Sequence, residues 1–541
     1  RKSAGGAYPH FTVDSTVPRS RIAETLDAAN RICEKHGVRV GHVFHAGDGN
    51  LHPSIMMDEH DPRQVQAVLR AAREIMQEIV RHDGAITGEH GVGIEKREFM
   101  PLMYSPNELA ALWDIKQVFD PNNLMNPGKI FPAEMPRAIP VAPAPNAPGD
   151  LFTPRTAEEA AAGLAALSAA KRVVSISGKP SAVGGRQSAV VLSTANLRGI
   201  LKYAPDDLYI TVGASTTLNE IQMFLAKDRR QVPLVSPWRD ATIGGLIAAN
   251  VNSPQRMLYG SVRDQLLCAT IALADGRVIR AGRPVVKNVA GYDLPKLFVG
   301  SYGTLGLLVD VTLKLMPLPR AKRTLLIPVD DLNRGMTWAS QLLPLALVAS
   351  AIVVAKIQNS KFEIPISNLQ SPYALVCTAE GIPEDVEAEL AQVCAALKEI
   401  GATQPMEVAA PSGTELWQEL GARAQPNALQ VRVGIAPKDV AACARERAAL
   451  LDVGSFLIDV ANGQITIVAE MGEPDRAKRW LEELQRAAFG IGGYAIATAL
   501  PEEMRSVVDR WGYCPESLNL MRALKARWDP AGILGAGTFM V

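Results

Sequence analysis

The chain has 541 residues, which is enough for three or four domains at the usual length of roughly 150 residues each. Hydrophobic residues make up 48% of it, so sizeable cores are expected and global disorder is excluded. The 56 basic and 56 acidic residues balance to a net charge of zero, which removes the electrostatic argument for binding nucleic acid or an anionic membrane.

The six cysteines are scattered and form no Cys-x-x-Cys motif, so neither a disulfide framework nor an iron–sulfur ligand set is indicated. This usage is typical of a reducing compartment, and we expect a cytoplasmic protein. The longest apolar run, residues 342–355, is interrupted by Pro344 and is shorter than the about 20 residues of a membrane-spanning helix. The chain starts at Arg1 with neither a methionine nor a signal sequence, as a fragment or a processed product does.

Histidines are concentrated in the first part of the chain. All eight lie within the first 90 residues, and His45 and His52 flank a turn at residues 47–50. Strand alternation would point residues seven apart to opposite faces, but the turn interrupts the alternation and lets both imidazoles converge. Downstream, Glu89 and His90 stand between glycines, where side chains pack poorly. A single histidine is more often an ordinary core or surface residue, whereas the combined pattern favours a site.

A stretch rich in proline and alanine follows this first part. Seven prolines lie between residues 132 and 154, which predicts a semi-extended linker and a domain boundary. Residues 115–128 and 524–537 share an apolar helix end, an Asp-Pro pair and a glycine at common spacing. Two such endings indicate two related modules in tandem, the first of which has lost its front half.

Strands and helices alternate around glycine-rich loops in the next part. Strands are expected at residues 172–177, 190–193 and 208–212. In residues 236–264, the glycines Gly244, Gly245 and Gly260 lack side chains and would let backbone amides neutralise a diphosphate. Hydroxyl, amide, carboxylate and apolar side chains of the same stretch would complete this binding surface: Thr242, Ile243, Asn250, Ser261 and Asp264. A glycine-rich turn before a core helix is the alternative interpretation.

Residues 321–500 alternate strands and helices without a chemical motif. We expect a cap of antiparallel sheet and helices. Four tryptophans are expected in the core rather than at a ligand site: Trp417, Trp480, Trp511 and Trp528.

The glycine-rich loops resemble, in order and spacing, those of the PCMH-type FAD-binding domain of the vanillyl-alcohol oxidase family, and within it the E subunits of bacterial glycolate oxidases: TIGG, YGSVRD, ADGRVIRAG and KNVAGYDLPKLFVGSYGTLG. The resemblance is strong for about residues 150–330 and weaker to Val541. It implies an α+β fold with two α+β subdomains that bind FAD noncovalently, and α+β cap domains, one of them truncated at the N-terminus. The cofactor-binding residues that it implies are Gly178, Lys179, Ser181, Pro237, Thr242, Ile243, Gly244, Gly245, Asn250, Gly260, Ser261, Val262, Asp264, Val278, Ile279, Gly291 and Tyr292.

The histidine segment resembles, through HxGDGNxH and GEHGxG, the C-terminal half of FAD-linked 2-hydroxy-acid dehydrogenases, among them glycolate oxidase D subunits and D-lactate and D-2-hydroxyglutarate dehydrogenases. The ligands of a divalent metal, zinc by their donor types, would be His45, His52 and Glu89. The resemblance further implies that Asn50 supports this site, that His90 is the general base and that Arg1 holds the substrate carboxylate. The substrate carbon would then give a hydride to flavin N5.

These resemblances divide the chain into a truncated cap segment, a linker, an FAD-binding domain and a cap or substrate domain, at residues 1–132, 133–153, 154–320 and 321–541. They predict an FAD-dependent 2-hydroxy-acid dehydrogenase that oxidises glycolate to glyoxylate. It would work with other glycolate oxidase subunits, including an iron–sulfur subunit, and reach a membrane only peripherally through such partners.

Two alternatives remain open at this point. One is a noncatalytic FAD-binding subunit that transfers electrons or acts as a scaffold, and the other is a D-lactate-type dehydrogenase. The metal ligands and the base lie in one module and the FAD domain in the other, although hydride transfer needs the reacting atoms about 3–3.5 Å apart. Because each cap should fit its own flavin domain, we expect the first cap to complete a flavin domain on another chain.

Overall fold

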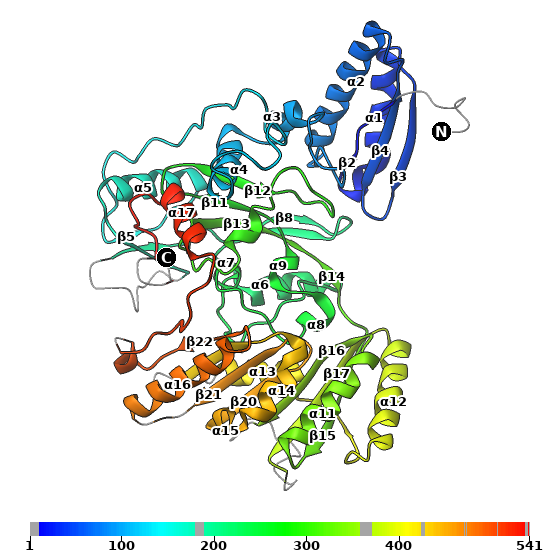
Figure 1. The fold of residues 1–541 in the computed structure, drawn as a ribbon. Helices are drawn as coiled ribbons and strands as arrows, with labels where there is room; N and C mark the ends of the chain where they lie inside the picture. Colours follow the sequence, from blue (N-terminus) through cyan, green and yellow to red (C-terminus); the bar gives the residue numbers. More distant parts are fainter. Residues whose placement is uncertain are drawn as a thin grey trace.

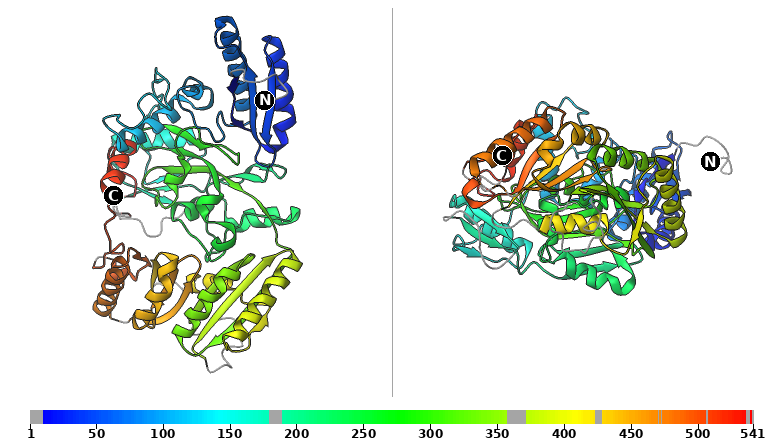
Figure 2. Two further views of the ribbon diagram at one scale, coloured as in Figure 1. Left: turned by 45° about the vertical axis from the view of Figure 1, so that its right-hand side comes forward. Right: turned by 90° about the horizontal axis from the view of Figure 1, so that it is seen from below.

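The computed structural model describes residues 10–178, 189–356, 371–422, 428–469, 471, 473–505, 507–535 and 539. The chain forms an N-terminal module, a central domain and a cap, stacked in that order, and the last helix returns from the cap to the central domain (Figure 1). Figure 2 shows the same three tiers from a second side. Within the described residues, no helix combines the length and the apolarity needed to cross a bilayer.

The N-terminal module is an antiparallel sheet packed against two helices that contact each other. Its central strand, β4, pairs with β3 along one edge and with β1 and β2 in succession along the other. The helix α2 buries Val68, Ala72, Ile75 and Ile79, which recur at helical spacing on one face. The elements are β1 (His10–Thr12), β2 (Ser15–Thr16), α1 (Ile22–Lys35), β3 (Val40–His45), β4 (Asn50–Met56), α2 (Pro62–Arg81), α3 (Met100–Met103) and α4 (Pro106–Phe119).

The central domain contains a three-stranded parallel sheet, in the order β5-β7-β6, and a five-stranded antiparallel sheet, in the order β12-β11-β13-β9-β8. A separate strand pair joins β10 to β14. Its strands are β5 (Leu151–Phe152), β6 (Val174–Ser177), β7 (Val190–Ser193), β8 (Ile200–Ala204), β9 (Tyr209–Gly213), β10 (Arg230–Gln231), β11 (Leu266–Ala272), β12 (Val278–Gly282), β13 (Leu307–Lys314) and β14 (Met316–Pro317). Its helices are α5 (Ala157–Ala169), α6 (Leu218–Leu225), α7 (Ile243–Ala248), α8 (Arg256–Tyr259), α9 (Val262–Gln265) and α10 (Pro295–Phe298).

The cap is built on an eight-stranded antiparallel sheet in the order β18-β15-β17-β16-β20-β21-β19-β22. Strand alternation separates its two faces: Val431 and Val433 of β19 lie in the core beneath the outer helices, and Leu326 of β15 lies in a second core that includes α13. Its strands are β15 (Ala321–Val329), β16 (Ala349–Lys356), β17 (Tyr373–Gly381), β18 (Met406–Val408), β19 (Leu429–Gly434), β20 (Gly454–Asp459), β21 (Gln464–Ala469) and β22 (Tyr494–Ala499). Its helices are α11 (Leu332–Leu342), α12 (Pro383–Glu399), α13 (Gly413–Ala422), α14 (Pro437–Glu446), α15 (Ala448–Leu451) and α16 (Pro474–Phe489).

The repeat expected at the two module ends is present in the structure. After α4, Asp120 pairs with Lys116 and accepts the amides of the residues four and five positions on, at 2.8 Å each. After α17 (Leu518–Trp528), Asp529 pairs with Lys525 at 2.8 Å and accepts the corresponding two amides at 2.9 and 2.8 Å. The two helices α4 and α17 pack against each other on the central domain.

One hydrophobic core runs through the N-terminal module, the five-stranded sheet and α17. It includes Leu112 of α4, Val311 of β13 and Trp528, which are all fully buried. The linker also lies against the protein, because Ile139 exchanges two backbone hydrogen bonds with the Asn107 amide and Val141 N donates to Gly276 O. The predicted domain boundaries stay a prediction, since the core is continuous across the linker.

Candidate cofactor and metal sites

A cavity of about 230 Å³, which we name the trough, opens between the two sheets of the central domain. The walls come from the end of β6, from α7 and from the loop before β13. The described lining residues are Ile176, Gly178, Thr194, Ala214, Thr242, Gly244, Gly245, Ala248, Ala249, Ser301, Tyr302, Gly303, Gly306, Leu307 and Leu308.

Gly244 and Gly245 leave space in the trough because they lack side chains, while their backbone amides donate hydrogen bonds within the protein. Gly245 is exposed to it, and a Cβ there would meet only the Thr242 hydroxyl, at 3.1 Å. A Cβ on Gly244 would come within 2.9 Å of the Ala214 carbonyl oxygen. Both amides already have acceptors, since Gly244 N donates to Ala214 O at 2.8 Å and Gly245 N donates to Thr242 Oγ1 at 3.3 Å. Gly244 N thus bonds to the chain just beyond β9 and Gly245 N to the cap of its own helix. The role expected for these amides in neutralising a diphosphate stays a prediction.

Five of the predicted cofactor residues line the trough or the cavities joined to it: Gly178, Pro237, Thr242, Gly244 and Gly245. The sequence prediction missed the wall formed by Ser301, Tyr302 and Gly303. The glycine-rich run at residues 299–306 was the signal that could have identified it.

Four predicted residues form a turn beside the cavities instead of lining them. Gly260 begins this turn with a φ of 83°, and the Ser261 amide and hydroxyl both donate to Asp264 Oδ2, at 2.8 and 2.7 Å. Val262 N donates to the side-chain oxygen of Asn252 at 2.9 Å. The turn thus positions Asn252, which does line a cavity.

The remaining described candidates lie in the core or at a boundary. Ile243 and Ile279 are fully buried, Val278 packs against the core of the three-stranded sheet, and Asn250 points its side-chain oxygen at Asn252.

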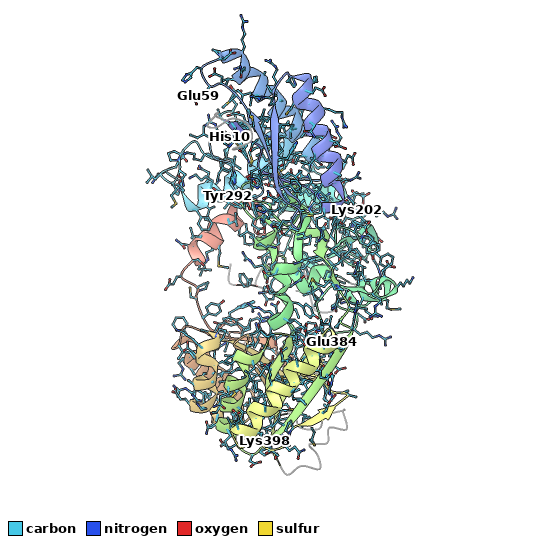
Figure 3. The ribbon with its side chains drawn as sticks, turned by 90° about the vertical axis from the view of Figure 1, so that its right-hand side faces the viewer. His10, Glu59, Lys202, Tyr292, Glu384 and Lys398 are labelled. Atoms are coloured by element: carbon cyan, nitrogen blue, oxygen red, sulfur yellow. The ribbon has the colours of Figure 1, made fainter. Side chains whose placement is uncertain are left out.

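Gly291 and Tyr292 contact the N-terminal module, and Figure 3 shows Tyr292 at that boundary. A Cβ on Gly291 would meet Leu112 at 3.4 Å, and the Tyr292 ring lies 6.2 Å from that of Phe131. Arg1, Lys179 and Ser181 lie outside the described residues.

A second cavity of about 140 Å³, which we name the interface cavity, lies between the central domain and the cap. It shares Ala249 and Tyr302 with the trough, so the two are contiguous. Its described lining also includes Pro237, Trp238, Val251, Asn252, Trp417, Gly421, Gln430, Arg432, Gln464, Thr466, Ile496, Ala497, Thr498, Arg510 and Trp511. The expectation that four tryptophans are core residues is confirmed for Trp417, Trp480 and Trp528, which lie in hydrophobic cores, although Trp417 also borders this cavity. It is wrong for Trp511, which is half-buried and borders the cavity.

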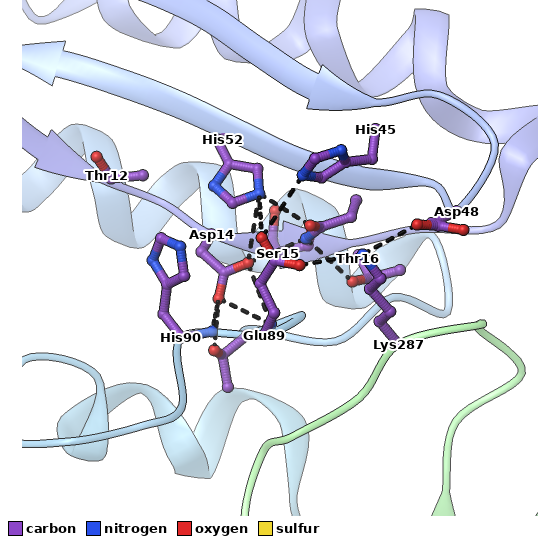
Figure 4. Close-up of polar contacts among 12 residues, drawn as sticks. Thr12, Asp14, Ser15, Thr16, His45, Asp48, His52, Glu89, His90 and Lys287 are labelled. Atoms are coloured by element: carbon purple, nitrogen blue, oxygen red, sulfur yellow. Dashed lines mark hydrogen bonds and ion pairs between the residues drawn. The ribbon is translucent and has the colours of Figure 1, made fainter.

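The structure brings the predicted metal ligands together at the mouth of the β3–β4 hairpin (Figure 4). Glu89 Oε1 lies 3.2 Å from His52 Nε2 and 3.6 Å from His45 Nε2. Ligand atoms about 2.0–2.2 Å from a tetrahedral zinc ion are about 3.3–3.6 Å apart, so the distances from Glu89 to the two histidines suit such an ion. His45 is not among the residues whose ligand atoms all lie within 4.8 Å of one another. The His90 ring lies 5.0 Å from the His52 ring. The turn at residues 47–50 therefore lets the imidazoles of His45 and His52 converge, as expected.

Asp14 organises this cluster, and the sequence prediction gave it no role. Its carboxylate accepts the side-chain amide of Asn50 at 2.9 Å, the hydroxyl of Thr87 at 2.7 Å and the backbone amide of His90 at 2.8 Å. Burial alone would raise the pKa of Asp14, but these bonds and the nearby Lys96 ammonium outweigh it and hold the pKa well below its usual range. Asp14, His52, Glu89 and His90 offer ligand atoms within 4.8 Å of one another. We assign Asp14 a supporting role, because its oxygens are already occupied by donors.

The charges around the cluster favour metal-binding protonation states. Burial lowers the pKa of His52, which favours the neutral imidazole that binds metals. Lys287 of the central domain lies 3.0 Å from Glu89 and 2.9 Å from Asp48, and its hydrogen bond lowers the pKa of Glu89. The carboxylate is thus ionised at neutral pH.

The cluster and the cavities are separate sites in this chain. None of the described residues that line the trough or the interface cavity precedes Ile176. The structure therefore does not bring His90 next to the trough. The cluster is linked to the central domain by the bond from Lys287 to Glu89 and by that from Val289 N to Thr87 O.

The fold is of the PCMH-type FAD-binding class, and two family models match parts of the chain. Residues 148–282 match the family described as FAD binding domain, and residues 2–130 match the family described as FAD linked oxidases, C-terminal domain. Alkyldihydroxyacetonephosphate synthase has a similar solved structure, with a TM-score of 0.53 at 15% identity over 71% of this chain and 76% of that one. That likeness shows the fold alone.

Among curated proteins, the chain is similar to subunits of glycolate oxidase, as its sequence predicted. GlcE of Escherichia coli (strain K12) is 38% identical over 154 residues, or 28% of this chain and 44% of the relative. GlcD of the same strain is 36% identical over 123 residues, or 23% of this chain and 25% of the relative. GlcD of Bacillus subtilis (strain 168) is 27% identical over 65% of this chain and 79% of the relative. The chain thus spans less than half the length of the two Escherichia coli relatives.

Proposed function

We propose that this chain is the FAD-binding subunit of a complex that oxidises a small 2-hydroxy acid, with glycolate as substrate and glyoxylate as product. The observation that carries the proposal is the trough, which is free of side chains at Gly245 and continues into the interface cavity. A dinucleotide lying along it would place its ring end against the cap. The similarity to glycolate oxidase subunits supports the choice of substrate.

FAD bound noncovalently in the trough supplies the hydride acceptor. The protein contributes a cavity bordered by Trp238, Trp417 and Trp511, and a wall of small residues in the trough that would admit the cofactor. The N-terminal cluster would add a divalent metal, zinc by its donor types, held by His45, His52 and Glu89. His90 would accept the proton of the substrate hydroxyl.

We propose that this cluster serves a flavin domain on another chain of the complex. The supporting observation is that the cluster borders neither cavity of its own chain. Onward transfer of electrons to an iron–sulfur subunit is part of the same proposal. A noncatalytic FAD-binding subunit is the second candidate, because the described lining of the interface cavity contains no histidine and no carboxylate.

The flavin can be tested directly. Purified protein should show a flavin spectrum, and acid precipitation should release the chromophore into the supernatant. Gly245→Val should abolish flavin binding without unfolding the protein, because the new side chain would fill the trough and meet only Thr242. Gly149→Val in the linker is the matched control, since a Cβ there meets nothing within 4 Å. Colourless wild-type protein that takes up no added FAD would refute the proposal.

Turnover distinguishes the two candidates. Glycolate-dependent reduction of a dye that requires an added partner subunit and is abolished by His90→Ala supports a cluster that acts across chains. Turnover by the complex that is insensitive to His90→Ala supports the noncatalytic alternative. D-lactate, compared as a substrate in the same assay, tests the third hypothesis.

A further inference from the structure

The described lining of the interface cavity carries positive charge. It contains two half-buried arginines, Arg432 and Arg510, and neither Asp nor Glu. An arginine does not lose its proton in a protein, so both charges persist in the cavity. Charge in such a place is costly unless an anion or several hydrogen bonds compensate it.

Strand alternation explains why these polar groups face the cavity. On β19, Val431 and Val433 point into the core beneath the outer helices, so Gln430 and Arg432 point to the opposite face. The neighbouring strand β21 repeats the pattern, with Ile465 and Ile467 in the core and Gln464 and Thr466 in the cavity. The cap therefore presents a polar floor to the central domain.

The protein leaves much of the hydrogen-bonding capacity of both guanidinium groups unused. Arg432 donates one terminal N–H to Asn250 O at 3.3 Å, while its buried Nε has no hydrogen-bond partner among the described residues. Arg510 donates from Nε and one terminal nitrogen to the carbonyl of Ala497, at 3.3 and 3.2 Å. Each guanidinium has five N–H groups, so several remain for a ligand.

A hydroxyl and an amide complete the arrangement. Thr498 Oγ1 donates to Gln430 Oε1 at 3.0 Å, which fixes the side-chain amide of Gln430 beside Arg432 on the same strand face. Two cations with a neighbouring hydroxyl and amide match a small organic acid that carries a carboxylate and a further oxygen.

We propose that Arg432 and Arg510 bind the carboxylate of the organic-acid substrate within this chain's own interface cavity. The inference rests on the proposed function, since the contiguous trough would place the flavin ring next to the acid. It assigns the carboxylate contact to the cap of the second module, at residues that no local motif marks. Arg1 of the first module would not be needed for this contact.

The test is a titration with oxalate, a dicarboxylate without a carbon-bound hydrogen to transfer. Binding is measured calorimetrically on protein with and without FAD, and in parallel by the change in the flavin absorption spectrum. Arg432→Gln and Arg510→Gln should each weaken oxalate binding by about tenfold or more, because a charge-assisted pair is lost. Arg432→Lys should retain part of the affinity, since it keeps the charge but not the fork of donors.

The control is Arg323→Gln, which removes an arginine from the same sheet where it pairs with Glu407 on the surface, and it should leave the affinity unchanged. Wild-type protein that binds no oxalate overturns the inference, and so does equal affinity in the wild type and both glutamine variants. Variants that lose FAD while their oxalate affinity stays unchanged also overturn it, because the arginines would then serve the flavin. Oxalate binding that depends on both arginines in colourless protein would support the inference while the proposed function fails.

Discussion

The indole N–H of Trp528 donates to Asp114 Oδ2 at 3.1 Å and so joins the last helix of the chain to α4 of the N-terminal module. The same carboxylate accepts Arg277 at 2.8 Å from the five-stranded sheet of the central domain. One side chain of the N-terminal module thus binds both the central domain and the returning tail. Asp114 therefore connects α4 to α17, the helices of the two repeated module ends.

Replacement of Asp114 by alanine should destabilise the protein by about 1–3 kcal/mol, because Arg277 and the Trp528 indole lose an acceptor in a largely buried place. Arg277 keeps its bond to Asp275, which limits the loss. The measurement is the free energy of unfolding from urea denaturation. Arg527→Gln is the matched control, since its contact with Asp114 is exposed and 3.4 Å long, and it should change the stability by under about 1 kcal/mol. Equal effects of the two variants would contradict the prediction.

The two lysines of the repeated tails should differ in their effect on the cofactor. Lys525 donates to Thr304 O, next to the trough residue Gly303, whereas Lys116 bonds only within its own tail, to Asp120 and Met125 O. Lys525→Met should therefore weaken FAD binding roughly tenfold through the loop before β13. Lys116→Met should leave FAD affinity unchanged. Fluorescence titration of the apoprotein with FAD gives both values, and equal losses would show that the tail acts only on global stability.

The buried carboxyl of Asp459 should make the stability of the cap depend on pH. Burial raises the pKa of Asp459 to about 7, although Asn462 donates two hydrogen bonds to it, at 3.2 and 2.8 Å. A carboxyl whose pKa rises on folding stabilises the fold below its unfolded pKa of about 3.9, and this contribution is lost as the pH rises through about 7. Asp459→Asn removes the titration.

The stability of Asp459→Asn relative to the wild type should increase by on the order of 2–3 kcal/mol between pH 5 and pH 8. Thermal unfolding at a series of pH values measures the change. Asp452→Asn serves as the control, because Asp452 is half-exposed and pairs with Lys356 at the surface of the same sheet. A pH-independent difference between Asp459→Asn and the wild type would show that the carboxyl does not titrate in this range.

The histidine cluster should bind one divalent cation per chain. His52→Ala or Glu89→Gln should each weaken zinc binding by at least about tenfold, because each removes a ligand atom from the set around Glu89 Oε1. Competition with a chelating dye measures the affinity without any turnover. His60→Ala, which removes a histidine 89% exposed outside the cluster, should bind zinc as the wild type does. If the wild-type protein binds zinc no more tightly than His52→Ala does, the histidine cluster is not a metal site.

Local pattern in the sequence predicted much of the fold. The strand expected at residues 190–193 has the same bounds as β7, and the strand expected at 208–212 is displaced by one residue in β9. Apolar alternation is a local property, so it survives without knowledge of the tertiary structure. The packing of α4 against α17 could not be predicted in this way, because the two helices are about 400 residues apart.

In the candidate sites, too, only features formed by residues close together in the sequence could be predicted. His45 and His52 were predictable because the turn between them is local, whereas Asp14 and Lys287 reach the cluster only through the folded chain. Glycine spacing located the trough, but it did not reveal that Gly244 N bonds to Ala214 O and Gly245 N to Thr242 Oγ1. Arg432 lies within β19 and Arg510 lies in the segment after β22, and no motif connects them.

The continuous core has a practical consequence for dissecting the molecule. Arg137 is exposed in the linker, so trypsin should nick the chain there, yet the N-terminal fragment should co-purify with the remainder because Leu112 and Trp528 are buried in common apolar surroundings. Expressing either fragment alone would leave that surface open to water and to aggregation. An intact linker should thus not be needed to hold the two fragments together, and we expect them to behave as one particle.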